Sequence, residues 1–239
     1  MWGSPTVWGV IVVFHILVIV GLYLYSQQPK AASVLDECHV IERKRQPDGT
    51  VVEIVTGDCK EGMPHTTTAD TIRMTRTIEA SPRYDIIMAH ERVHLDQKQR
   101  PAVWRALVKR IWSYDLYEEP PSGIPAEWVR KRRPNPDTDS APWAVWRGRY
   151  VFFAAFTEEK LLRTAPVLVW DLDSNRLVEV PPEWRGQFCW EDRLPHQYEH
   201  PYELAAEYMA EPTHKNHPCP AAAALFASVG SSASASATA

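Results

Sequence analysis

The chain has 239 residues, of which 45% are hydrophobic and 23% are charged, and its formal net charge is −4 at pH 7. Its 10 Trp and 9 Tyr beside only 10 Gly exclude collagen-like and wholly disordered chains, and the slightly acidic balance gives no electrostatic footprint for nucleic acid. The 4 cysteines, none in a CxxC pair, are too few for a disulfide scaffold. We therefore expect one folded domain with terminal extensions and no nucleic-acid partner.

The N-terminal segment is predicted to be a membrane anchor. Residues 1–28 contain no Asp, Glu, Lys or Arg, and residues 7–25 form an apolar run that would extend about 28 Å as a helix, close to the thickness of a bilayer core. No basic residue precedes the run, which favours a single-pass anchor over 1–33, although a signal peptide cleaved after Ser33 stays open as the alternative. The side of the membrane stays open too, because basic residues after the span favour a cytoplasmic domain whereas a downstream disulfide would favour an oxidising compartment.

Residues 37–59 predict two alternating strands around a turn at Gln46-Pro47-Asp48-Gly49, where Pro presets the first corner and Gly accepts a positive φ. With a two-residue loop, Cys38 and Cys59 would face each other in a non-hydrogen-bonded pair, close enough for a disulfide. With a three-residue turn the register shifts by one, and the two thiols fall on opposite faces. The Cys38–Cys59 disulfide is therefore one of two alternatives.

A strand over residues 71–78 and a helix from Ser81 to Gln99 follow. Ser81-Pro82 is typical of a helix start, with Ser as N-cap and Pro in the first turn, and Arg100-Pro101 ends the helix.

The helix contains the pattern His90-Glu91-Arg92-Val93-His94. Histidines four apart lie one turn above each other, so both imidazoles can bind one metal ion, while Glu91, about 100° around the helix, can reach a water on that ion. This is the HExxH pattern of zinc metalloproteases, in which the Glu takes a proton from the metal-activated water. A metzincin is excluded because its later Gly and His are replaced by Gln97 and Arg100.

A second helix, predicted over His200–Ala210, offers the third ligand that HExxH lacks. Its Glu203 and Glu207 are four apart and share one face. HExxH followed by ExxxE resembles the gluzincin-type zinc metallopeptidases, and the resemblance covers residues 82–99 and 200–211. It implies that His90, His94 and Glu203 bind Zn²⁺, that Glu91 is the general base, and that Glu207 holds one of the two histidines from the second shell. It also implies that the strand over 71–78 lines the cleft and pairs with an extended peptide substrate.

Alternatives remain open for several of these roles. The gap of 109 residues between His94 and Glu203 is longer than in compact gluzincins, and the two glutamates could instead belong to a solvated helix face. Other possible third ligands are Glu158, Glu159, His196 and His200. Gln97, one turn beyond His94, is a further candidate for a hydrogen bond to a ligand.

The remaining segments predict a helix over 101–117 and hairpins over 143–156 and 167–180. The basic run 130–133 precedes a loop and is expected to be solvated. Residues 219–239, rich in Ala and Ser, are expected to be disordered.

These segments together predict an α+β fold with a zincin-like domain over 34–218, built from the active-site helix and a small mixed sheet, behind an N-terminal transmembrane helix. The expected function is a membrane-anchored metallopeptidase that uses Zn²⁺ to hydrolyse protein or peptide substrates. The alternative is a non-enzymatic membrane-anchored structural or interaction protein, such as an inactive relative of the zincins.

Overall fold

The structure, a computed structural model, describes residues 38–56, 59–156, 165–189, 198–216 and 218–235. These residues belong to a unit that begins at Cys38. The predicted anchor, the alternative cleavage after Ser33, and the candidate ligands Glu158, Glu159 and His196 lie outside the described residues. Among the helices of the described part, none combines the length and the apolar character that a membrane crossing needs.

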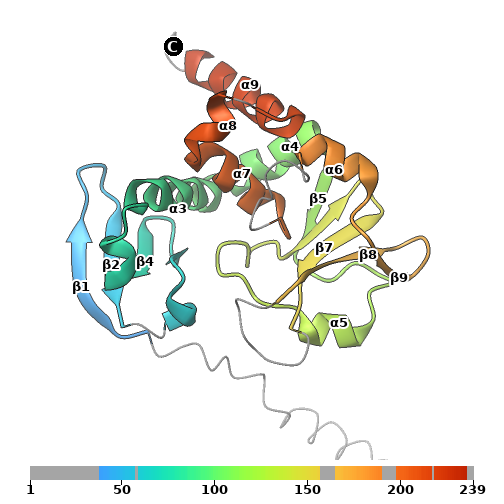
Figure 1. Ribbon diagram of the computed structural model, residues 1–239, viewed down its shortest axis with the longest axis horizontal. Helices are drawn as coiled ribbons and strands as arrows, with labels where there is room; N and C mark the ends of the chain where they lie inside the picture. Colours follow the sequence, from blue (N-terminus) through green and yellow to red (C-terminus); the bar gives the residue numbers. More distant parts are fainter. Residues whose placement is uncertain (1–37, 57–58, 157–164, 190–197, 217, 236–239) are drawn as a thin grey trace, which may run out of the picture. The chain divides into compact units, whose positions relative to one another are not determined.

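The first half of the unit contains a mixed four-stranded sheet, called sheet A. In spatial order its strands are β1 (Val40–Arg45), β2 (Val51–Val55), β4 (Thr71–Thr75) and β3 (His65–Thr66). The central pair, β2 and β4, is parallel, and the two outer pairs are antiparallel. Alternate residues of β2 and β4 pack against Met88 and Leu95 of helix α3 (Tyr84–Gln99), so α3 covers one face of the sheet (Figure 1).

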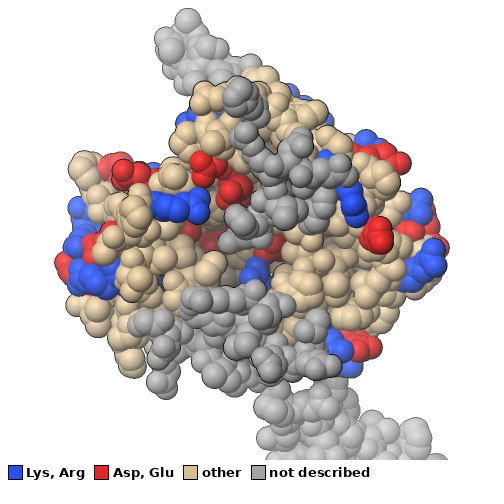
Figure 2. All heavy atoms as spheres, in the orientation of Figure 1, with Lys and Arg blue, Asp and Glu red and all other residues tan. Residues whose placement is uncertain are grey.

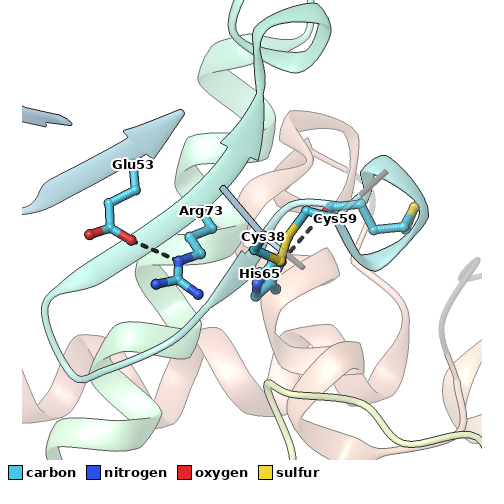
Figure 3. The surroundings of a disulfide bond; sticks show 6 residues. Cys38, Glu53, Cys59, His65 and Arg73 are labelled. Carbon is cyan, nitrogen blue, oxygen red and sulfur yellow. Dashed lines mark hydrogen bonds and ion pairs between the residues drawn. A yellow bond between two sulfur atoms is a disulfide. The ribbon is translucent and has the colours of Figure 1, made fainter. Parts of the chain in front are cut away.

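The Cys38–Cys59 disulfide is present, but the cross-strand geometry predicted for it is wrong. β1 and β2 pair Arg45 with Val51 around a three-residue turn, and a bulge near the start of β1 shifts the register once more. Cys59 instead lies beyond β2, in the short 3₁₀ helix η1 (Cys59–Gly62), which returns the chain to Cys38 with a Cα–Cα distance of 4.8 Å (Figure 3).

The strand and helix boundaries before the HExxH motif differ from the predicted ones. The strand expected over 71–78 ends at Thr75, whose side chain accepts a hydrogen bond from Ile78 N and caps the short helix α2 (Arg76–Glu79). Ser81 is not a helix cap, because its carbonyl and hydroxyl oxygens accept hydrogen bonds in a turn before α3.

The helix predicted over 101–117 is also shorter than expected. Helix α4 (Pro101–Trp112) ends because Ser113 adopts a left-handed conformation with φ 61°. Residues Tyr114–Tyr117 then form strand β5, which pairs with β6. The apolar pattern continues across this junction, so periodicity alone does not reveal it.

The second half of the unit contains an antiparallel five-stranded sheet, called sheet B. Its order is β5, β6 (Trp143–Trp146), β7 (Tyr150–Ala154), β8 (Val167–Asp171) and β9 (Arg176–Val178). Both predicted hairpins are confirmed, and Arg147 and Asn175 adopt positive φ in their turns. One face of sheet B packs against α5 (Ala126–Lys131), and the other contributes to the largest hydrophobic cluster, where α4 and the C-terminal helices meet (Figure 1).

The C-terminal segment expected to be disordered instead begins with a buried helix. The helices of this part are α6 (Pro182–Phe188), α7 (Pro201–Ala210), α8 (Pro212–Asn216) and α9 (Pro220–Ala235). In α9, Ala221, Ala222 and Leu225 are fully or almost fully buried, and the Trp112 indole donates a hydrogen bond to Ala221 O at 3.0 Å. Alanine has the highest helix propensity, and the apolar face of α9 completes the core around Trp112.

We expect Leu225→Ala to lower the free energy of unfolding by about 2–5 kcal/mol, because it removes a fully buried side chain from the largest core cluster. Urea unfolding followed by tryptophan fluorescence measures this change. Ala223→Ser, at an exposed position of the same helix, is the control and should cost less than about 1 kcal/mol. An unchanged midpoint for Leu225→Ala would contradict the packing of α9.

Candidate metal centre

Three side chains from α3 and α7 meet at one point. The Nε2 atoms of His90 and His94 are 3.0 Å apart. Glu203 Oε2 lies 3.3 Å from each of these nitrogens. A tetrahedral ion with ligands at about 2.0–2.1 Å places its ligand atoms about 3.3 Å from one another. The three atoms therefore fit three corners of one tetrahedral zinc site, with the fourth corner left for water or substrate.

The helices place these atoms for simple reasons. α3 sets the two histidines one turn apart on one face. Ala205 and Ala206 of α7 are fully buried, and their small side chains let α7 pack closely along α3. The His94 side chain is 1% exposed whereas that of His90 is 16% exposed, so the centre is reached from the His90 side.

Figure 2 shows a hollow on one face of the molecule, between the part that carries sheet A and the part that carries sheet B, with acidic and basic atoms visible inside it. An open fourth position at a centre of this kind is typical of catalytic rather than structural zinc sites.

Two carboxylate oxygens at the centre support the binding of a cation. Glu91 and Glu203 are 2% and 1% exposed, and among the described residues the Oε2 atom of each makes no hydrogen bond. A buried carboxylate oxygen without a partner is costly. Two imidazoles and one carboxylate are a donor set that zinc accepts, so the residues present fit such an ion.

Gln97 orients His94. The Nδ1–H group of His94 donates to Gln97 Oε1 at 2.7 Å, and Gln97 Nε2 donates to the carbonyl oxygen of Tyr202 at 3.1 Å. Because Nδ1 keeps a proton for this hydrogen bond, Nε2 is the nitrogen that would give up its proton and bind a metal ion. Gln97 also ties α3 to α7 at the level of the ligands.

Glu207 approaches the other histidine. Its Oε2 atom lies 3.9 Å from His90 Nδ1, within ion-pair range but beyond hydrogen-bond distance. Each histidine thus has its own outer neighbour: Gln97 for His94 and Glu207 for His90.

Sequence reasoning missed Asn135, which holds the second oxygen of Glu203. Its Nδ2 donates to Glu203 Oε1 at 2.7 Å, and its own Oδ1 accepts a hydrogen bond from Asp137 N at 3.0 Å. Asn135 is 8% exposed and lies between Pro134 and Pro136 in the loop after the basic run. The two flanking prolines indicate a stiff loop, but no sequence signal relates that loop to Glu203.

The loop that carries Asn135 is fixed to both α3 and sheet A. Asp137 Oδ1 accepts hydrogen bonds from the Thr66 amide, at 2.8 Å, and from the Thr66 hydroxyl. Lys98 Nζ donates to Thr66 O at 2.8 Å and to Pro136 O at 3.0 Å. Thr66 belongs to β3, an edge strand of sheet A. The strand predicted to line the cleft corresponds to β4, which is an interior strand of that sheet.

The buried charges set the protonation of the centre. Burial alone would lower the pKa of His94, but the carboxylates of Glu203, Asp137 and Glu91 outweigh it and raise that pKa to about 10. Burial raises the pKa of Glu91 well above its usual value, and the Asp137 charge adds to the effect. Burial would also raise the pKa of Glu203, yet His94 and His90 hold it well below its usual range. Without a metal ion, a proton on His94 therefore balances the Glu203 carboxylate.

His200 does not replace Glu203 as a ligand. Its Nε2–H group donates to Ala141 O at 2.9 Å, and its Nδ1 accepts from Tyr202 N at 3.2 Å as the cap of α7. Both ring nitrogens are therefore used away from the centre. The expectation of a fully solvated basic run is also wrong at Arg133, which pairs at 2.5 Å with the buried carboxylate of Glu199.

Gln97→Ala is expected to weaken metal binding about 10–100-fold, because it removes the acceptor that fixes the His94 tautomer. Titration of the metal-free chain with Zn²⁺ in competition with a chromophoric chelator measures the affinity. Gln99→Ala changes an exposed glutamine two positions away and should leave the affinity unchanged. Equal affinities for wild type and Gln97→Ala would show that His94 does not depend on this contact.

No family model, no curated protein and no solved structure matches this chain. The chemistry of the site is therefore the guide to its function.

Proposed function

We propose that this protein is a zinc-dependent metallopeptidase of the gluzincin type. The observation that carries the proposal is the convergence of His90 Nε2, His94 Nε2 and Glu203 Oε2 at tetrahedral spacing. Glu91 lies on the turn of α3 that carries both histidines, and its buried Oε2 makes no hydrogen bond within the described part of the chain, which supports Glu91 as the general base of this triad.

Each residue would have a defined part in peptide hydrolysis. A zinc ion bound by the triad would polarise the scissile carbonyl and lower the pKa of a water molecule. Glu91 takes the proton from the attacking water and passes it to the leaving nitrogen. Gln97 keeps His94 in the tautomer that binds through Nε2, and Asn135 holds the Glu203 carboxylate in place.

The proposal extends to location and substrate. An anchor over residues 7–25 would hold the domain at a membrane, and the substrate would be a protein or peptide there. The proposed architecture is zincin-like, with α3 as the active-site helix and sheet A as its mixed sheet.

The test uses the full chain, purified in detergent and loaded with Zn²⁺. We expect about one zinc per chain by elemental analysis, and cleavage of a quenched-fluorescence peptide library that stops on chelation and returns when Zn²⁺ is added back. His94→Ala should lose both the zinc and the cleavage. Folded wild-type chain that binds no zinc would exclude the proposal.

Zinc binding without cleavage would favour the non-enzymatic alternative, in which the metal only stabilises the fold. Under that alternative, chelation lowers the melting temperature, and no substitution at Glu91 changes any measured activity.

A further inference from the structure

A second group of metal-ligating side chains lies where β3 begins, at the edge of sheet A. The two sulfur atoms of Cys38 and Cys59 and a ring nitrogen of His65 all lie within 4.8 Å of one another. Figure 3 shows His65 directly beside the disulfide, with the imidazole next to the sulfur atoms. Cys59 and His65 are 1% and 3% exposed, whereas Cys38 is only partly buried, so solvent reaches the group from the Cys38 side.

We propose that reduction of the Cys38–Cys59 disulfide creates a second zinc site, formed by the two thiolates and the imidazole of His65. Nothing in the centre between α3 and α7 contributes a ligand to it, so this inference does not depend on the proposed peptidase function.

The hydrogen bonding of His65 prepares it for this role. Its Nδ1–H group donates to the carbonyl oxygen of Met63 at 3.2 Å. Nε2 is then the unprotonated nitrogen, with its lone pair available to a metal ion. The contact also fixes the orientation of the ring, because Met63 and His65 follow η1 directly along the chain.

The distances suit zinc once the sulfur–sulfur bond is broken. Thiolates bind Zn²⁺ at about 2.3 Å, so two of them on a tetrahedral ion lie about 3.8 Å apart. The two Cα atoms, 4.8 Å apart, allow that separation by rotation of the side chains without moving β1 away from η1. Two soft thiolates and one imidazole are a donor set that zinc prefers.

The redox step balances with a dithiol reductant. The dithiol gives two electrons and two protons to the disulfide, so the Cys38–Cys59 bond breaks, two thiols form, and the reductant becomes a disulfide. Binding of Zn²⁺ then releases the two thiol protons. The group therefore holds a disulfide in an oxidising compartment and a metal ion in a reducing one.

The redox state of this site would also affect the first centre, formed by His90, His94 and Glu203. His65 is followed by Thr66, which holds Asp137, and the loop of Asp137 carries Asn135 next to Glu203. The redox state of the cysteines thus acts on a strand that supports the Glu203 carboxylate.

The test measures zinc stoichiometry in the full chain carrying Glu203→Gln and His90→Ala, which removes the first centre. We expect no zinc per chain in the oxidised form and about one after reduction by a trialkylphosphine, which takes its oxygen from water as it reduces the disulfide. Loading with Co²⁺ in place of Zn²⁺ should give a thiolate-to-cobalt charge-transfer band only after reduction.

Further substitutions in the chain that already carries Glu203→Gln and His90→Ala identify which residues bind the second zinc ion. Cys59→Ser and His65→Gln should each lose the reduction-dependent zinc, whereas Cys189→Ser and Cys219→Ser, which change the cysteines outside the disulfide, should keep it. Far-ultraviolet circular dichroism shows whether each variant is folded. Reduced chain that stays folded and binds no zinc, or zinc that persists in Cys59→Ser, overturns the proposal, as does a chain that unfolds on reduction in the presence of zinc.

Discussion

Glu91→Gln is expected to reduce peptide hydrolysis by about 10²–10⁴-fold while the chain keeps its zinc. The substitution preserves the size of the side chain but removes the carboxylate that accepts the proton of the attacking water. Glu91 is not one of the three residues whose ligand atoms converge, so the zinc content of the variant should equal that of wild type. Rates on the best peptide from the library screen, measured beside elemental analysis of the same samples, give both quantities.

A matched control is Arg92→Gln, at the next position of α3. Arg92 is half exposed and pairs with Asp48 in the turn between β1 and β2, so its loss should leave the rate unchanged. Hydrolysis by Glu91→Gln at the wild-type rate would rule out Glu91 as the base, even if zinc is bound by the predicted triad.

Glu203→Ala is expected to abolish stoichiometric zinc binding and to remove the thermal stabilisation that zinc gives. The ion would lose one of three protein ligands, and His90 and His94 alone do not complete a zinc site. In wild type, excess metal stabilises the folded chain by RT ln(1 + [Zn]/Kd), so a metal at about 1,000 times its dissociation constant contributes about 4 kcal/mol. The melting temperature of Glu203→Ala should therefore be the same with zinc and with a chelator.

Glu207→Ala is the graded control for that experiment. Glu207 lies one turn further along α7 and contacts His90 only at 3.9 Å, so its removal should weaken zinc binding without abolishing it. A Glu203→Ala chain that still binds one zinc would move the third ligand to another residue. Loss of zinc in Glu207→Ala as complete as in Glu203→Ala would make Glu207 a direct ligand.

The local parts of the centre could be predicted from the sequence because they depend on helix geometry. His90 and His94 face the same way whenever residues four apart lie on one helix, and the same holds for Glu203 and Glu207. Asn135 could not be predicted, because its contact with Glu203 joins residues 68 apart through a loop whose path depends on Asp137 and Thr66. Tertiary contacts of this kind leave no periodic signal.

In the fold too, local elements could be predicted, whereas features that depend on tertiary contacts could not. Alternating residues and turn signals predicted both hairpins of sheet B. β5 was missed because a single left-handed residue, Ser113, divides one continuous apolar pattern into a helix and a strand. α9 was missed because a composition rich in Ala and Ser suggests disorder unless a core surface is available to cover it, and Trp112 provides that surface only in the folded chain.

Along the chain, all five strands of sheet B fall between the two helices that supply the ligands, because β5 to β9 lie between positions 94 and 203. An ion held by α3 and α7 would therefore close a ring of 109 residues. For a flexible ring of that length, the length-dependent entropy of closure is about 4 kcal/mol. If the sheet melted with the ion still bound, its strands would stay tethered at both ends and search a smaller space before refolding. The metal ion would then be a cross-link that restricts the unfolded chain, in addition to its part in catalysis.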